Sequence, residues 1–156
     1  MRSIPLLAIL FFSISAYSQV NSDTLVSADT VVFVKKDTVS IIGVGDIMMG
    51  TNYPEDRLPP GDGDFLMQNV ESVLQDADVT FGNLEGTLLD SGGTAKKCKD
   101  PKVCYAFRTP VRYVKNLVKA GFDIMALANN HAGDMGDEGR QSTMATLDSA
   151  GILHAG

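Results

Sequence analysis

The sequence is poor in the residues that mark several common classes of protein. Its 156 residues include no tryptophan, only two cysteines and only two histidines. Two cysteines are too few for a disulfide scaffold or for a four-cysteine zinc site. Basic residues are also scarce, because 13 Lys and Arg face 19 Asp and Glu, giving a net charge of −6. Nucleic acids and anionic membranes attract basic surfaces, so we exclude both as the main partner.

The residues that are present are typical of one globular domain or of part of a larger one. Hydrophobic residues make up 44% of the chain and charged residues 21%. This proportion supplies enough apolar surface to offset the entropy that folding costs. We therefore expect a folded domain rather than a disordered chain.

The N-terminus has the pattern of an export signal. Arg2 supplies a positive charge, residues 4–14 are mainly apolar, and Ala16 and Ser18 are the small residues expected before a cleavage site. The apolar run is short for a membrane-spanning helix. We predict a signal peptide over residues 1–18, an exported protein, and membrane contact only through this signal. A buried N-terminal helix is the alternative.

Export changes the meaning of the two cysteines. Cys98 and Cys104 lie six residues apart in a polar, lysine-rich loop. In an oxidising compartment this pattern favours a disulfide between them. Two free thiols and metal ligation are the alternatives, and the second lacks a nearby histidine.

Apolar periodicity predicts strands that alternate with helices. A linker with a possible first strand covers residues 19–39, and residues 31–36 and 40–45 form either a hairpin or two separate strands. The expected strands are 40–45, 78–85, 122–128 and a last one from 152, and the expected helices are 64–77, 110–120 and 137–150. The apolar run 122–128 suggests a strand buried on both faces. Short connections between such elements favour a parallel sheet with right-handed crossovers, so the predicted fold class is α/β.

Polar residues stand at the end of three of these strands. They are Asp46 after the first strand, Asn83 and Glu85 at the end of the second, and Asn130, His131 and Asp134 after the third. Ligand sites of open parallel sheets lie beyond the carboxyl ends of the strands. Carboxylates gathered there repel one another, and a divalent metal supplies the counter-charge. Taken singly, each residue has a structural interpretation as a turn or loop residue. Together they predict a site for Mn, Mg, Zn or Fe.

Four segments carry a family resemblance. They are GVGDIMMG (43–50), ADVTFGNLEGTL (77–88), AGFDIMALANNHAGDMGDEG (120–139) and the following TLDSAGI and AG. They resemble the bacterial capsule-synthesis CapA family, also called the poly-γ-glutamate capsule biosynthesis family, which is related to calcineurin-like metallophosphoesterases. The resemblance covers residues 40–156. It implies the N-terminal portion of a metallophosphoesterase-like αββα sandwich, at the periplasm or cell surface of a bacterium.

The resemblance also implies roles for the strand-end residues. Asp46, Glu85 and Asn130 are similar to metal ligands, and Glu85 to the acidic residue that bridges two metals. His131 resembles the histidine that contacts the transferred phosphoryl group. We expect Asp134 to orient His131, as a carboxylate that fixes the tautomer of an imidazole.

Other positions concern the substrate or depart from the pattern. Met48 stands where the superfamily's Asp-x-His motif has its histidine, which leaves the first metal position short of a ligand. Asn83 and Arg108 are the candidate substrate contacts. A lysine cluster surrounds the two cysteines and consists of Lys96, Lys97, Lys99 and Lys102. It either recruits an anionic polymer or is simply solvated.

Two functions follow from these observations. The first is a metal-dependent hydrolase or transferase in the biosynthesis of capsule, poly-γ-glutamate or a related surface polymer, acting on a phosphate ester or an anionic polymer. The second is a non-catalytic factor that binds or exports such a polymer. Family members continue well past residue 156, so we expect an N-terminal fragment of the domain that is inactive alone. The oligomeric state is left open.

Overall fold

A computed structural model of the protein describes residues 38–156. The predicted signal peptide, most of the predicted linker and the strand candidate 31–36 lie outside the described residues. From residue 38 onward, the chain forms no helix with both the length and the apolar character needed to cross a membrane.

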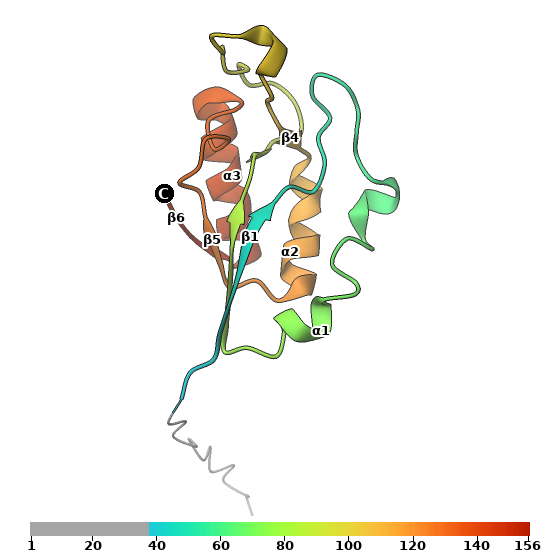
Figure 1. The fold of residues 1–156 in the computed structure, drawn as a ribbon, viewed down its shortest axis with the longest axis vertical. Coiled ribbons are helices and arrows are strands. Elements are labelled where there is room, and N and C mark those ends of the chain that lie inside the picture. The colour runs from blue at the N-terminus through green and yellow to red at the C-terminus, as the bar shows by residue number, and fades with distance from the viewer. Residues whose placement is uncertain (1–37) are drawn as a thin grey trace, which may run out of the picture. The chain divides into compact units, whose positions relative to one another are not determined.

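Four parallel strands form the main sheet (Figure 1). They are β1 (Ile41–Ile47), β2 (Val79–Leu84), β5 (Ile124–Ala126) and β6 (Leu153–Ala155), in the order β1-β2-β5-β6. Each neighbouring pair is parallel. The predicted α/β class with parallel β-α-β units is therefore confirmed, and the carboxyl ends of β1, β2 and β5 share one edge.

Two helices cover one face of this sheet. They are α2 (Val114–Ala120) and α3 (Gly136–Ala150), which lie on the same side of the strands in Figure 1. Leu117 of α2 and Leu147 of α3 are fully buried and join Met125 of β5 in a single core. Both helices end at a glycine in the left-handed conformation, Gly121 and Gly151, directly after the predicted ranges 110–120 and 137–150.

The other face of the sheet is open among the described residues. Along β2, Thr80 and Gly82 are buried while Phe81 between them is 40% exposed. Leu153 of β6 is 68% exposed. Burial also alternates in β5, which has only three residues. The expectation that the 122–128 run is buried on both faces is therefore wrong for this part of the chain.

The predicted helix 64–77 is mostly absent. A 3₁₀ turn (Pro60–Gly63) precedes a series of tight turns, and only α1 (Glu71–Leu74) is helical. Of the predicted apolar stripe, Leu74 is buried, whereas Val70 and Val73 are 46% and 61% exposed. Helices in proteins gain most of their stability by burying an apolar stripe. Because this stripe is not covered, the periodicity alone does not produce a full helix.

A small parallel ladder follows β2, and the sequence did not predict it. It consists of β3 (Thr87–Leu88) and β4 (Arg108–Thr109). The segment between the two strands contains a 3₁₀ turn (Pro101–Val103) and a disulfide between Cys98 and Cys104. A further 3₁₀ turn (Val111–Tyr113) leads from β4 into α2. The ladder thus anchors the lysine-rich loop next to the carboxyl edge of the sheet.

Candidate functional site

A β-bulge near the end of β1 sets the position of Asp46. Gly43 pairs with Phe81 and Asp46 pairs with Asn83, so β1 takes three steps where β2 takes two. Such an extra residue bends a strand and redirects its side chains. Asn83 Nδ2 donates a hydrogen bond of 2.6 Å to Asp46 Oδ1. The bulge therefore aligns the first predicted site residue with the second strand.

Asn129 connects β2 to the segment after β5. Its Nδ2 donates to Asn83 Oδ1 and to the carbonyl oxygen of Leu84, both at 2.9 Å. Its Oδ1 accepts a hydrogen bond of 2.9 Å from the backbone N–H of His131. A continuous network therefore runs from Asp46 through two carboxamides to the histidine.

The His131 ring lies between two carboxylates and beside an aromatic ring. Nδ1 lies 2.8 Å from Asp134 Oδ2, and Nε2 lies 3.5 Å from Glu85 Oε1. The Phe107 ring stacks on the imidazole with 4.5 Å between centroids. The side chain of His131 is only 11% exposed. The ring is therefore held on three sides, with its Nε2 directed toward the carboxyl end of β2.

Asp134 is the most buried charged group of the site, because its side chain has no exposed surface. Oδ2 accepts a hydrogen bond of 2.6 Å from the backbone N–H of Phe107. Oδ1 faces Lys96 Nζ at 2.6 Å, as an ion pair rather than a directed hydrogen bond. A buried carboxylate needs such a cation and such donors to offset the loss of water.

The structure brings five of the predicted residues into this network, namely Asp46, Asn83, Glu85, His131 and Asp134. Asn130 differs from them, because its side chain is exposed and makes no hydrogen bond to any other described residue. Only its carbonyl oxygen takes part, accepting from Lys96 Nζ at 3.2 Å. The amide that lies inside the network is that of the neighbouring Asn129.

Arg108 is committed to structural contacts. Its Nε donates to Asn52 Oδ1 at 2.8 Å and its Nη1 donates to the Gly92 carbonyl at 3.0 Å. The guanidinium carbon lies 5.5 Å from the centre of the Tyr53 ring. These contacts hold the guanidinium over Tyr53 and use two of its donors, which leaves less of it for a substrate.

Sequence reasoning did not predict the contacts of three residues that shape the site, namely Asn129, Lys96 and Phe107. Asn129 belongs to the Asn-Asn-His run, and only its contacts with Asn83 and Leu84 of β2 show which of the two amides turns inward. Lys96 stands out from its lysine cluster only through an ion pair to a residue 38 positions later. Phe107 carried no local signal at all.

The donors of this site suit a divalent cation in kind. They are carboxylate and carboxamide oxygens with one imidazole, a set that Mn, Mg, Zn and Fe accept. In number they fall short, because residues 38–156 contain no group of three or more His, Cys, Asp and Glu side chains placed to hold a metal. A cation bound here would need Asn or backbone oxygens, or ligands beyond these residues.

A cleft of about 310 Å³ adjoins the site. We call it the Tyr53–Tyr105 cleft, and it is lined by Met48, Gly50, Thr51, Tyr53, Pro54, Glu55, Arg57, Cys104, Tyr105, Ala106 and Phe107. Phe107 is its link to the site, since the same ring stacks on His131. Met48 forms another part of its wall and follows Asp46 by two residues.

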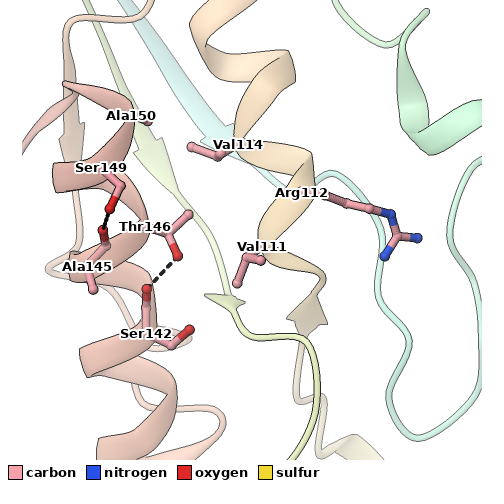
Figure 2. A pocket seen from close by; sticks show the side chains of 8 residues that line it. All are labelled: Val111, Arg112, Val114, Ser142, Ala145, Thr146, Ser149 and Ala150. Atoms are coloured by element: carbon pink, nitrogen blue, oxygen red, sulfur yellow. Dashed lines mark hydrogen bonds between the residues drawn. The ribbon is translucent and has the colours of Figure 1, made fainter.

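A second hollow, of about 520 Å³, lies between α2 and α3 (Figure 2). Small side chains of α3 line it, and none of the network residues does. The hydroxyls of Thr146 and Ser149 donate to the carbonyls of Ser142 and Ala145 on the same helix, as Figure 2 shows. The hydroxyl protons of Thr146 and Ser149 are therefore already used within α3.

Comparison with known proteins gives concordant matches. The family described as "Bacterial capsule synthesis protein PGA_cap" matches residues 40–156. The chain is 28% identical over 122 residues to "Capsule biosynthesis protein CapA" of Bacillus anthracis, covering 78% of this chain and 29% of the relative. It is 32% identical over 108 residues to "PGA biosynthesis protein CapA" of Bacillus subtilis (strain 168), covering 69% and 27%.

A third relative carries no functional name. "Uncharacterized protein y4sH" of Sinorhizobium fredii (strain NBRC 101917 / NGR234) is 33% identical over 126 residues, covering 77% of this chain and 25% of the relative. The chain therefore spans about a quarter of the length of these curated relatives.

Proposed function

The chain belongs to the PGA_cap family of bacterial capsule synthesis proteins, and from this premise we propose that the network at the carboxyl ends of β1, β2 and β5 forms part of a metal-dependent hydrolase or transferase site. The family is metallophosphoesterase-like, and the parallel β-α-β units agree with that class. We further propose an exported, surface-associated protein that acts in the synthesis of a capsule or related surface polymer. The names of two relatives support this role.

One observation carries the proposal. Residues that lie far apart in the sequence, from Asp46 to His131, are joined by hydrogen bonds no longer than 2.9 Å along one edge of the sheet. Polar side chains that served only as separate turns would not need to meet. Their convergence beyond the strand ends is where open parallel sheets hold their ligands.

The residues of the network have distinct tasks in this proposal. Asp46, Glu85 and Asn130 would hold a divalent metal, which when bound supplies Lewis acidity and a more acidic bound water. Asp134 holds the imidazole of His131 in place through Nδ1. Nε2 then faces the position of the reacting group, where it can accept a proton from it or donate one to it.

The surroundings support an anionic, extended substrate, either a phosphate ester or a charged surface polymer. Lys97, Lys99 and Lys102 are exposed on the disulfide loop. Such lysines raise the local concentration of an anion without fixing its orientation. We propose that the Tyr53–Tyr105 cleft receives the part of the substrate that does not react, while the reacting group lies at His131.

The test of the proposal pairs metal content with turnover. In the purified full-length protein, Asp46→Ala and Asn130→Ala should each lower bound Mn²⁺ and the hydrolysis of a chromogenic phosphate diester together. Asp76→Ala is the matched control, because Asp76 is also an exposed aspartate and precedes β2 rather than following a strand. Parent-level hydrolysis in the Asp46→Ala protein would show that the site has been assigned wrongly.

A non-catalytic polymer-binding factor is the second candidate function. It is favoured by Met48 at the place of a ligand histidine and by the shortage of metal-binding side chains in residues 38–156. In that case Lys97→Ala combined with Lys99→Ala should weaken binding of an anionic polymer, and added salt should weaken binding by the parent protein. Asp46→Ala should leave this binding unchanged. Asp46→Ala and the Lys97→Ala, Lys99→Ala double variant therefore distinguish the two functions.

A further inference from the structure

We propose that Lys96 is a positioning residue, which fixes the tautomer and orientation of the His131 ring through Asp134. The proposal rests on the role of His131 given above and extends it to a residue of the disulfide loop. It separates Lys96 from its neighbours in the lysine cluster, which remain solvated.

Lys96 differs from those neighbours in its contacts. Its side chain is only 24% exposed, whereas Lys97 and Lys99 are exposed. Nζ lies 2.6 Å from Asp134 Oδ1, and it donates to the carbonyl oxygen of Asn130 at 3.2 Å. Holding a lysine in one rotamer costs side-chain entropy, so this arrangement needs the buried carboxylate to stabilise it.

Both ends of the loop that carries Lys96 are hydrogen-bonded to Asp134. At the first end, the backbone N–H of Lys96 donates to the Asp134 carbonyl at 2.9 Å. At the second end, the backbone N–H of Phe107 donates to Asp134 Oδ2 at 2.6 Å. The Cys98–Cys104 disulfide closes the loop between them. The loop therefore acts on His131 in two ways. Lys96 acts through its ion pair with Asp134, and Phe107 acts through its ring, which stacks on the imidazole.

The contacts define which nitrogen of His131 carries its proton. Asp134 Oδ2 lies 2.8 Å from Nδ1, and a carboxylate can only accept a hydrogen bond. Nδ1 must therefore be the donor, which leaves the lone pair of neutral His131 on Nε2. Lys96 Nζ lies 3.3 Å from Nδ1, where two donors face each other, so its effect on the ring passes through Asp134.

Removing the positive charge should loosen this arrangement. Without Lys96, Asp134 Oδ1 loses the cation that lies 2.6 Å from it, and only the Phe107 N–H and the His131 ring still meet the carboxylate. The carboxylate is then no longer held in one position against Nδ1, so the ring is no longer confined to one tautomer.

The experiment is ¹⁵N NMR of protein labelled at histidine, recorded without metal or substrate and well above the ordinary histidine pKa of about 6.5. The chain has only two histidines, and His154 on β6 serves as the internal reference for folding. In the parent protein, His131 should show a protonated Nδ1 and an unprotonated Nε2. In Lys96→Met both nitrogens should shift toward the intermediate values of a ring that exchanges between its two tautomers.

Two further variants isolate the charge of Lys96. Lys97→Met removes an exposed charge next to it and should leave the His131 spectrum unchanged. Lys96→Arg keeps the charge and should retain the parent tautomer. A Lys96→Met protein with a parent-like His131 spectrum and intact His154 signals would overturn the proposal. So would a Lys96→Arg spectrum that matches Lys96→Met.

The parent spectrum can overturn the proposal even if Lys96→Met does not fold. A proton on Nε2, or on both nitrogens, would overturn the proposal without any variant. Because no metal or substrate is present, the result does not depend on turnover. Loss of the proposed enzymatic function would leave the spectrum as expected, so the two failures are distinguishable.

Discussion

The two halves of the candidate site differ in how far the protein itself completes them. Around His131, Asp134 is fully buried and each of its carboxylate oxygens meets a donor or a cation. Around Asp46, the carboxylate is exposed and has one hydrogen-bond partner, Asn83. The His131 half is therefore preorganised by the fold, whereas the Asp46 half is open to a ligand or to another part of the protein. Preorganisation of the first kind is what a histidine needs to act in one orientation.

The largest expected effect contrasts the two aspartates directly. Asp134→Ala should lower the free energy of unfolding by about 3–5 kcal/mol, because it leaves Lys96 without its counter-ion and the part-buried N–H of Phe107 without its acceptor. Asp46→Ala should change it by less than about 1 kcal/mol, since the side chain is exposed. Urea denaturation of both variants measures the difference. Equal losses would mean that the two halves are equally built into the fold.

The loop that holds the buried half provides the next effect. Replacing Cys98 and Cys104 together by alanine should destabilise the protein by about 2 kcal/mol, the value expected from a short closed loop. Hydrogen exchange should quicken at the backbone N–H of Phe107, which the loop presents to Asp134, and remain slow at Leu117 in the core. Unchanged exchange at Phe107 would show that the ladder alone holds this segment.

The smallest expected effect concerns the aromatic face of His131. Phe107→Leu should cost about 0.5–1.5 kcal/mol beyond the area lost, because it removes the stacked ring. Tyr105→Leu is the control, since Tyr105 is 63% exposed and should change stability by no more than about 0.5 kcal/mol. Thermal unfolding of both variants gives the comparison. If Tyr105→Leu cost as much as Phe107→Leu, stacking on His131 would not be the cause.

The sequence was sufficient for those parts of the fold that follow from periodicity and chain direction. Strands that alternate with helices through short connections favour a parallel sheet, and in the structure the carboxyl ends of β1, β2 and β5 share one edge. Gly121 and Gly151 mark the ends of the helices because only glycine readily adopts their positive φ values of 83° and 73°. These features depend on local pattern alone.

The sequence was insufficient wherever tertiary contacts decided the outcome. The stripe from residue 64 to residue 77 has helical spacing, but its apolar side chains are largely uncovered and only α1 forms. The bulge in β1 shifts Asp46 by one residue against β2, and no local pattern announces it. In the sequence, Lys96 cannot be distinguished from the other lysines of its cluster, and only the fold brings it to Asp134. In each case a long-range contact overrides the local signal.

The central claim is that Asp46, Glu85 and the Asn130–His131 pair surround one cation at the carboxyl edge of the sheet. Titration of the ¹⁵N-labelled protein with Mn²⁺ tests it, because the ion broadens the NMR signals of nearby amides. We expect broadening at the carboxyl ends, at Ile47, Glu85 and His131, with the amino ends at Ile41 and Val79 spared, and its loss in Asp46→Ala. Broadening that is absent, uniform along the strands or unchanged in Asp46→Ala would contradict the claim.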